Sequence, residues 1–190
     1  RSDNQDAKAH EYAELMVGEV DRLNRLVSAL LQFSRPRNPE FINVDLCALA
    51  HHSLTFVQAD ADSQQITLSL NLPEAEIHLH ADPDLMQQVL LNLLQNSLAA
   101  IGTDGTIELG IEQNANEVKI WVKDSGKGLS SEEQTKIFDP FFTTRKDGTG
   151  LGLAVVQKIV EQHMGHIAVE SNKGQGTSIS VFLPLDGGIQ

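Results

Sequence analysis

The sequence predicts an α+β fold: a two-layer α/β sandwich in which helices cover one face of a mixed β-sheet, preceded by one long N-terminal helix. Apolar residues recur at spacings of three and four over residues 6–34 and 83–101, which indicates amphipathic helices. Apolar and polar residues alternate over residues 66–72 and in two later strand pairs, which indicates half-buried strands. The chain has 190 residues, of which 41% are hydrophobic, so it can bury a core of ordinary size.

Charge and cysteine content exclude several classes of protein. The formal net charge of −12 argues against nucleic-acid binding, because no basic stripe is available to neutralise phosphates. The single cysteine, Cys47, excludes an internal disulfide and a cysteine-based zinc site, and is typical of a reducing compartment. No apolar run is long enough to span a membrane. Because the chain begins at Arg1 and not at methionine, we expect it to be part of a longer protein.

The predicted N-terminal helix has a broad apolar face and ends at Pro36. Such a large apolar surface on one helix needs a partner, so we expect an antiparallel bundle or a dimer. The segment 36–41 contains two prolines and is predicted to be a linker. It divides the chain into residues 1–36 and 37–190.

The sequence pattern of residues 37–190 predicts both helices and strands. Asp45 is predicted to cap a helix that runs to about Ala61, and Asp82 to cap a helix that begins at Pro83 and ends near Ile101. The other predicted elements are strands 66–72, 77–80, 106–113 and 117–124, a short helical piece near 132–138, a helix ending near residue 163, and a closing hairpin of strands 166–171 and 177–183.

A glycine-rich stretch, Asp147-Gly-Thr-Gly-Leu-Gly-Leu, runs directly into the helical pattern that ends near residue 163. Glycine has no Cβ, so backbone N–H groups can approach a ligand closely, and a helix N-terminus favours an anion such as phosphate. By itself the pattern is a weak signal, because a glycine-rich loop before a helix is often only a flexible connector. It is not a P-loop, because no Gly-Lys-Ser or Gly-Lys-Thr follows Gly152.

Primary amides line one face of the predicted helix 83–101. Gln88, Asn92 and Asn96 are four residues apart, while leucines occupy the opposite face. A solvent face normally carries Lys and Glu, and asparagine is a poor helix former, so the pattern indicates a role for the amide oxygens. One such oxygen could complete the shell of a Mg²⁺ that otherwise takes phosphates and waters. His78 and His80 share a strand face, but with no third ligand evident we interpret them as solvent-facing.

Two further stretches carry chemistry. In Asp124-Ser-Gly-Lys-Gly, an acid ends a strand and could accept from the exocyclic amine of a flat base, although a simple turn explains the pattern equally well. In residues 137–146, three phenylalanines in an irregular segment predict a loop that packs onto a ligand and releases it. Arg145 and Lys146 in this loop could reach a terminal phosphate.

In this order and spacing, the four stretches resemble the N box, first glycine box, F box and second glycine box of two-component sensor histidine kinases. The resemblance covers residues 36–185 and implies a catalytic ATP-binding domain with the Bergerat fold of the GHKL ATPases. Residues 6–35 resemble the second helix of the dimerisation and phosphotransfer hairpin of these kinases. The sequence DPFFTTR…GTGLGLAVV is most similar to that of nitrogen-regulator-type and Zra-type sensors, which act on enhancer-activating response regulators.

The resemblance also implies a set of site residues. Asn96 would be the magnesium ligand, Asn92 would lie near the phosphates, and Asp124 would accept from the adenine amino group. Arg145 or Lys146 would meet the γ-phosphate, which makes these two and Asn92 the candidate catalytic residues. The remaining candidate nucleotide-binding residues are Gly126, Gly128, Thr144, Gly148, Thr149, Gly150, Leu151, Gly152 and Thr177.

The phospho-acceptor motif of that family, a histidine followed by an acid and soon by Asn-Pro, is missing. His10-Glu11 matches only its first two positions, so we interpret His10 as a surface histidine and expect the first hairpin helix to lie outside this sequence. Two alternatives are a GHKL-type ATPase and a nucleotide-binding regulatory module without kinase activity. Gyrase-type and chaperone-type ATPases place a glutamate four residues before the magnesium asparagine, where this chain has Asn92, so hydrolysis is predicted to be slow.

The function that the resemblance implies is binding of Mg-ATP, with ATP and Mg²⁺ as cofactors. The full-length protein would transfer the γ-phosphoryl group to a hairpin histidine, for relay to an aspartate of a response regulator. This chain alone is predicted not to phosphorylate itself. We expect a homodimer through the N-terminal helical region, no nucleic-acid partner, and a place in the cytoplasmic part of a protein anchored in the bacterial inner membrane.

Overall fold

The computed structural model describes residues 16–18, 20, 27, 38–145 and 148–185. Most of the predicted N-terminal helix lies outside these residues, and those of it that are described, Met16–Gly18, Val20 and Val27, are helical. The predicted linker is described from Asn38, and it has no regular secondary structure up to Phe41. The division into residues 1–36 and 37–190 therefore stays a prediction.

A mixed sheet forms one layer of the described part of the chain. Its strands lie in the order β2-β4-β5-β7-β6, with β2 and β4 parallel and the other neighbours antiparallel. The mixed sheet predicted from the sequence is thus confirmed. The strand bounds are Ile66–Asn71 for β2, Gly105–Gln113 for β4, Glu117–Asp124 for β5, His166–Ser171 for β6 and Thr177–Pro184 for β7.

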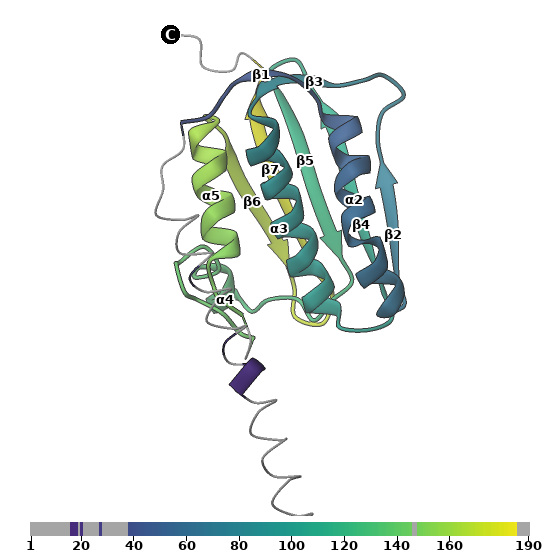
Figure 1. Ribbon diagram of the computed structural model, residues 1–190, viewed down its shortest axis with the longest axis vertical. Coiled ribbons are helices and arrows are strands. Elements are labelled where there is room, and N and C mark those ends of the chain that lie inside the picture. Colours follow the sequence, from purple (N-terminus) through teal and green to yellow (C-terminus); the bar gives the residue numbers. More distant parts are fainter. Residues whose placement is uncertain (1–15, 19, 21–26, 28–37, 146–147, 186–190) are drawn as a thin grey trace, which may run out of the picture.

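The helices α2 (Leu46–Ser63), α3 (Pro83–Ile101) and α5 (Gly152–Gln162) lie side by side over one face of the sheet. The two-layer sandwich expected from the sequence is therefore confirmed. A short helix, α4 (Ser131–Gln134), lies beyond the end of the layer at which α5 begins (Figure 1). It replaces the longer helical piece predicted near residues 132–138.

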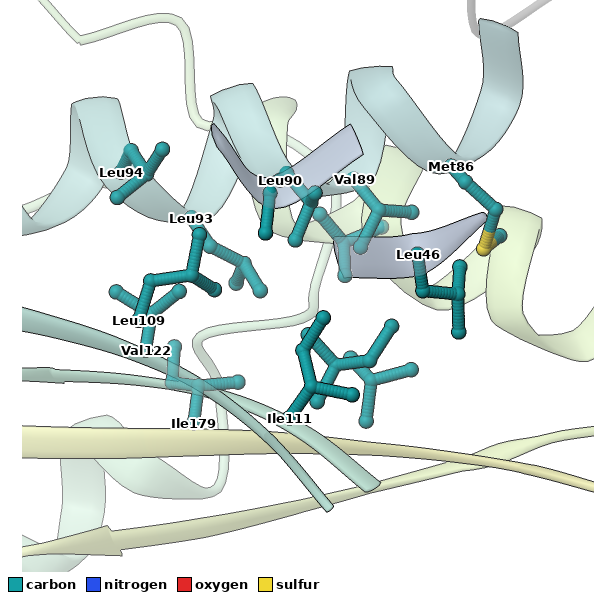
Figure 2. Close-up of a cluster of buried hydrophobic side chains, with 14 of the residues drawn as sticks. Leu46, Met86, Val89, Leu90, Leu93, Leu94, Leu109, Ile111, Val122 and Ile179 are labelled. Atoms are coloured by element: carbon teal, nitrogen blue, oxygen red, sulfur yellow. The ribbon is translucent and has the colours of Figure 1, made fainter. Parts of the chain in front are cut away.

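The core lies between α3, the central helix, and the strands beneath it (Figure 2). Because residues alternate across a strand, one face of each central strand presents its apolar side chains to the helices. Full burial of one such side chain stabilises the fold by roughly 1.5–3 kcal/mol. The central buried side chains include Met86, Val89, Leu90, Leu93 and Leu94 of α3 and Leu109, Ile111, Val122 and Ile179 of the sheet.

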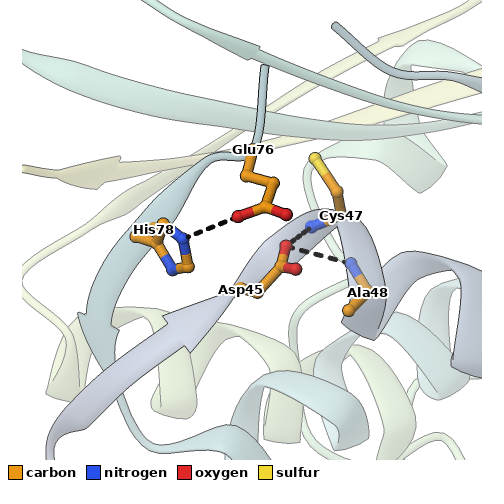
Figure 3. Close-up of polar contacts among 5 residues, drawn as sticks. All are labelled: Asp45, Cys47, Ala48, Glu76 and His78. Carbon is orange, nitrogen blue, oxygen red and sulfur yellow. Dashed lines mark hydrogen bonds and ion pairs between the residues drawn. The ribbon is translucent and has the colours of Figure 1, made fainter. Parts of the chain in front are cut away.

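A strand that the sequence did not predict, β1 (Ile42–Asp45), precedes α2. It pairs antiparallel with β3 (His78–Ala81) in a separate two-stranded sheet, so the shorter predicted strand at 77–80 is not part of the main sheet. Only Val44 of β1 is buried, which explains why no alternation reveals the strand. Its last residue is nevertheless the predicted helix cap. Oδ1 of Asp45 accepts the N–H groups of Cys47 at 2.9 Å and Ala48 at 3.1 Å (Figure 3).

The cap of α3 also agrees with the sequence. The Asp82 carboxylate accepts the N–H groups of Asp84 and Leu85, both at 3.1 Å, and Pro83 occupies the first helical position. Proline suits this position because its missing N–H would have no partner within the helix. In the described ranges, none of the helices is both long and apolar enough to cross a membrane.

Candidate functional site

A two-part cleft lies where α3 ends and α5 begins. One part is bounded by the C-terminal half of α3, the end of β5 and the lid (residues 137–145), and its apolar lining includes Ala99, Ala100, Leu129 and Ile179. The other part is lined by amides of α3 and by the glycine stretch. The two parts adjoin, because six residues line both of them. These shared residues are Asn96, Ile137, Phe142, Thr143, Arg145 and Leu153.

Asp124 lies in the apolar part, with only 7% of its surface exposed. Its Oδ1 accepts the backbone N–H of Gly126 at 2.8 Å and of Thr177 at 3.3 Å, while Oδ2 accepts the hydroxyl of Ser97 at 3.2 Å. Burial raises the pKa of the Asp124 carboxyl above its ordinary value, and these donors act in the opposite direction. A buried carboxylate beside apolar walls can accept a hydrogen bond from the amine of a flat heterocycle.

Asn92 and Asn96 line the polar part from adjacent turns of α3, and both side chains are half-buried. The start of α5 faces them across the cleft. A Cβ added at Gly152 would lie 3.5 Å from Oδ1 of Asn92 and 3.8 Å from Nδ2 of Asn96. Glycine at this position therefore keeps the space between the two helices open beside the amides. The unpaired N–H groups and positive dipole end of α5 make this part of the cleft favourable for an anion.

The lid and the glycine stretch are tightly packed against each other. The N–H of Phe141 donates to the carbonyl of Gly150 at 2.9 Å. Gly150 has a φ of +67°, and a Cβ there would collide with the backbone of Phe141. A Cβ at Gly148 would likewise collide with Oγ1 of Thr143. Glycine is therefore required at position 150, where the added carbon would meet backbone, whereas at position 148 it would displace the Thr143 side chain.

The basic residues of the cleft come from both of its sides. Arg145 lines both parts, whereas Lys127 lines the apolar part from the segment that follows β5. Nζ of Lys127 donates to Oγ1 of Thr144 at 3.2 Å, which ties that segment to the lid. Lys146, the other predicted catalytic cation, lies outside the described residues.

Most of the predicted site residues come together in this cleft. Those that line it are Asn92, Asn96, Asp124, Thr144, Arg145, Gly148, Thr149, Gly150, Gly152 and Thr177. Of the other four predicted residues, Lys146 lies outside the described residues and the remaining three do not line the cleft. Gly126 donates to Asp124, Gly128 packs against the backbone of Asn172 with a φ of +64°, and the Leu151 side chain is fully buried.

Ser97 and Lys127 line the cleft although sequence reasoning assigned them no role. Ser97 directly follows Asn96 and does not share the helical face on which Gln88, Asn92 and Asn96 are four residues apart. Lys127 stands between the two glycines of the Asp124 stretch, and the glycines, not the cation, are the feature that this pattern makes conspicuous. In both cases the neighbouring predicted residue was the available signal.

The amide side chains of the cleft fit a magnesium ion that is carried into the cleft by a phosphate ligand. Among the described residues, no group of three or more His, Cys, Asp or Glu side chains could hold a metal ion. The amide oxygen of Asn96 is a hard ligand of the kind that Mg²⁺ accepts, and Mg²⁺ usually completes its shell with phosphate oxygens and waters. The cleft therefore suits a metal carried by a phosphate and not a protein-enclosed metal.

Comparisons with known proteins agree with this geometry. The family described as histidine kinase-, DNA gyrase B- and HSP90-like ATPase matches residues 81–187. The sensor histidine kinase ZraS of Klebsiella oxytoca is 46% identical over 183 residues, which is 96% of this chain and 40% of that protein. This chain thus spans well under half the length of that relative.

Solved structures give the same picture. The catalytic domain of histidine kinase ThkA, free of nucleotide, matches with a TM-score of 0.70 and 30% identity over 77% of this chain and 96% of that chain. ThkA in complex with the response regulator protein TrrA matches with a TM-score of 0.80 and 29% identity, over 94% of this chain and 52% of that chain.

Proposed function

The chain belongs to the family of histidine kinase-, DNA gyrase B- and HSP90-like ATPases, and on that premise we propose that its cleft binds Mg-ATP for transfer of the γ-phosphoryl group to a histidine. The observation that carries this proposal is the division of the cleft. A buried carboxylate stands among apolar walls at one end, and amides and a helix N-terminus stand at the other. An adenine nucleotide has the matching polarity, with a flat amine-bearing base at one end and phosphates at the other.

Each part of the nucleotide has a proposed partner. The Asp124 carboxylate accepts from the adenine amine, and Ile137, Leu153 and Ile179 enclose the ring. Asn96 holds the metal, which, when bound, neutralises phosphate charge, while Asn92 lies beside the phosphates. The glycine stretch and the start of α5 supply N–H groups to the phosphate chain, and Arg145 reaches its end from the lid. Catalysis then depends on positioning and charge neutralisation, because the chain offers no covalent chemistry to the phosphoryl group.

Asn92 also bears on the choice among reactions. Activation of water needs a general base, and an amide cannot accept a proton at neutral pH. A cleft with an amide at this position protects the γ-phosphate until a better nucleophile approaches. This supports phosphoryl transfer over the alternative of a fast ATPase.

The acceptor and the partner are proposed on the basis of the relatives. ZraS is a sensor histidine kinase, and ThkA is a histidine kinase whose structure was solved with a response regulator. We propose that the parent protein phosphorylates a histidine on a helical hairpin and passes the group to an aspartate of a response regulator, in the nitrogen-regulator class. Residues 1–36 would supply one hairpin helix and residues 37–190 the catalytic domain. The parent would be anchored in the bacterial inner membrane, with this part on the cytoplasmic side.

A homodimer through the N-terminal region is supported by exposed apolar side chains. The apolar residues of that region that the structure describes, Met16, Val17, Val20 and Val27, are helical and 54–69% exposed. Apolar side chains this exposed favour burial against a partner helix.

Incubation of the chain with γ-labelled ATP and Mg²⁺ tests the function. We expect saturable ATP binding by calorimetry and no acid-labile label on the chain alone. Extension of the chain by an upstream helix that carries an acceptor histidine should allow labelling. Absence of ATP binding would refute the proposal. Label on the chain alone would refute the prediction that the chain contains no phospho-acceptor histidine. Binding without labelling of the extended protein would favour a nucleotide-binding regulatory module.

A further inference from the structure

Ser97 makes a polar contact that the proposed function does not use. It lies on α3 directly after Asn96, is only 5% exposed, and donates its hydroxyl to Oδ2 of Asp124 at 3.2 Å. The contact joins residues 27 positions apart and brings the helix that carries the proposed metal ligand onto the acid proposed to bind the base. Ser97 and Asp124 both line the apolar part of the cleft.

The hydrogen bonds around Asp124 leave a defined place for a ligand. A carboxylate oxygen accepts about two hydrogen bonds. Within the described residues, Oδ1 receives the N–H groups of Gly126 and Thr177, so its capacity is used. In the part of the chain that the structure describes, Oδ2 receives only the Ser97 hydroxyl and keeps one acceptor position. A hydrogen-bond donor on the ligand can therefore occupy the remaining acceptor position on Oδ2 of Asp124.

We propose that Ser97 is a positioning residue that sets base specificity: its hydroxyl holds Asp124 as a fixed acceptor, so that the cleft takes a purine with an amine at C6 and rejects one with a carbonyl there. This inference rests on the proposed nucleotide function. Two acceptors facing each other repel, and a site whose polar groups are left unpaired rejects the wrong ligand strongly. That rejection requires an ionised carboxylate held in place.

Loss of the Ser97 hydroxyl weakens both requirements, which are that the Asp124 carboxylate is ionised and that it is held in place. Oδ2 then has only the ligand as a partner, so the carboxylate is less strictly held against rotation. The Ser97 hydroxyl also lowers the pKa of Asp124, and its loss makes this buried carboxyl easier to protonate. A protonated carboxyl can donate to a carbonyl. Both effects reduce binding of an amine-bearing base and improve binding of a carbonyl-bearing one.

Calorimetric titration of the whole chain with ADP and with IDP tests the inference. IDP carries a carbonyl at C6 in place of the ADP amine and a hydrogen on the adjacent N1, and its sugar and phosphates are those of ADP. The wild-type chain should prefer ADP, and Ser97→Ala should lower the ratio of the two affinities about tenfold, the effect of one hydrogen bond to a charged group. Ser97→Thr keeps a hydroxyl on Cβ and should restore most of the ratio.

Ser53→Ala is the matched control. Ser53 is also a buried helical serine, but its hydroxyl donates to the carbonyl of Leu49 at 2.8 Å within α2, away from the cleft lining. It should leave the ratio of affinities unchanged. Equal weakening of ADP and IDP in Ser97→Ala would show a structural role only and overturn the inference, as would an unchanged ratio. A wild-type chain that binds neither nucleotide would instead refute the proposed function, and this inference with it.

Discussion

The backbone N–H of Asp82 donates to Nε2 of His163 at 3.1 Å, so one imidazole joins the start of α3 to the end of α5. Nδ1 of the same ring bonds to the carbonyl of Ile159 at 2.8 Å, and a carbonyl can only accept. His163 is therefore neutral, with its proton on Nδ1. The Asp82 carboxylate also accepts the N–H of Glu40 at 2.8 Å, and the Phe41 ring lies 5.0 Å from the His163 ring. Glu40 and Phe41 therefore contact the start of α3 and the end of α5, the two helix ends that lie away from the cleft.

This junction predicts that acidification destabilises the fold. Burial lowers the pKa of His163 from its ordinary value of 6.5, which outweighs the opposite effects of the Ile159 carbonyl and the Asp82 carboxylate. Because the folded pKa lies below the unfolded one, the stabilisation is complete above about pH 6.5 and is lost as the pH falls through the folded pKa. Urea denaturation at about pH 7.5 and about pH 5.5 should therefore show a lower free energy of unfolding at the lower pH.

Replacement of the imidazole isolates its share of that effect. His163→Leu should cost roughly 1–3 kcal/mol at the higher pH, because the buried N–H of Asp82 loses its acceptor. The same variant should lose less stability than the wild type on acidification. His78→Leu serves as the control for the loss of an imidazole, since His78 is exposed, and it should cost less stability than His163→Leu at the higher pH. A wild-type pH dependence in His163→Leu would contradict the assignment.

Asp124→Asn is predicted to weaken ADP binding by about tenfold or more, because an amide replaces the charged acceptor of the base amine. Fluorescence or calorimetric titration of ADP measures the loss. Asp60→Asn makes the same chemical change on the exposed face of α2 and should leave the affinity unaltered. If Asp124→Asn binds ADP as well as the wild type, Asp124 has no role at the base.

Asn96→Ala is predicted to reduce the benefit that Mg²⁺ gives to nucleotide binding. The proposed amide ligand is lost, so affinity for ATP should fall in the presence of Mg²⁺ and change little when EDTA removes the metal. Titrations with and without Mg²⁺ supply the internal control. An equal loss under both conditions would assign Asn96 to the nucleotide itself and not to the metal.

Gly150→Ala is predicted to displace the lid. The added Cβ would collide with the Phe141 backbone, so the lid and the glycine stretch cannot keep their present packing. Gly174→Ala is a close control, because Gly174 also has a positive φ, of +80°, but its Cβ would meet no atom within 4 Å. Both variants carry the backbone cost of about 1–2 kcal/mol. Only Gly150→Ala should also weaken Mg-ATP binding and speed proteolysis at residues 137–145.

Some elements of the fold can be predicted because residues adjacent in the sequence define where they begin and end. Helix α3 has the predicted bounds because Asp82 and Pro83 define its start. Gly102, with a φ of +81°, follows its end. Strand β1 shows the opposite case. Its four residues contain one buried side chain, and it exists through pairing with β3, which lies more than thirty residues later. Pairing at that distance leaves no trace in the local pattern.

The same division runs through the candidate site. Amide spacing on one helix, an acid at a strand end and glycines before a helix are short-range patterns, and by itself the sequence determined these features together with the helix caps and the apolar core. Only the tertiary structure decided that Ser97 donates to Asp124, and that His163 accepts from Asp82 across 81 positions. The physical reason is that such contacts depend on how the helices pack on the sheet. Packing arises from the summed burial of many apolar side chains, and no single residue encodes it.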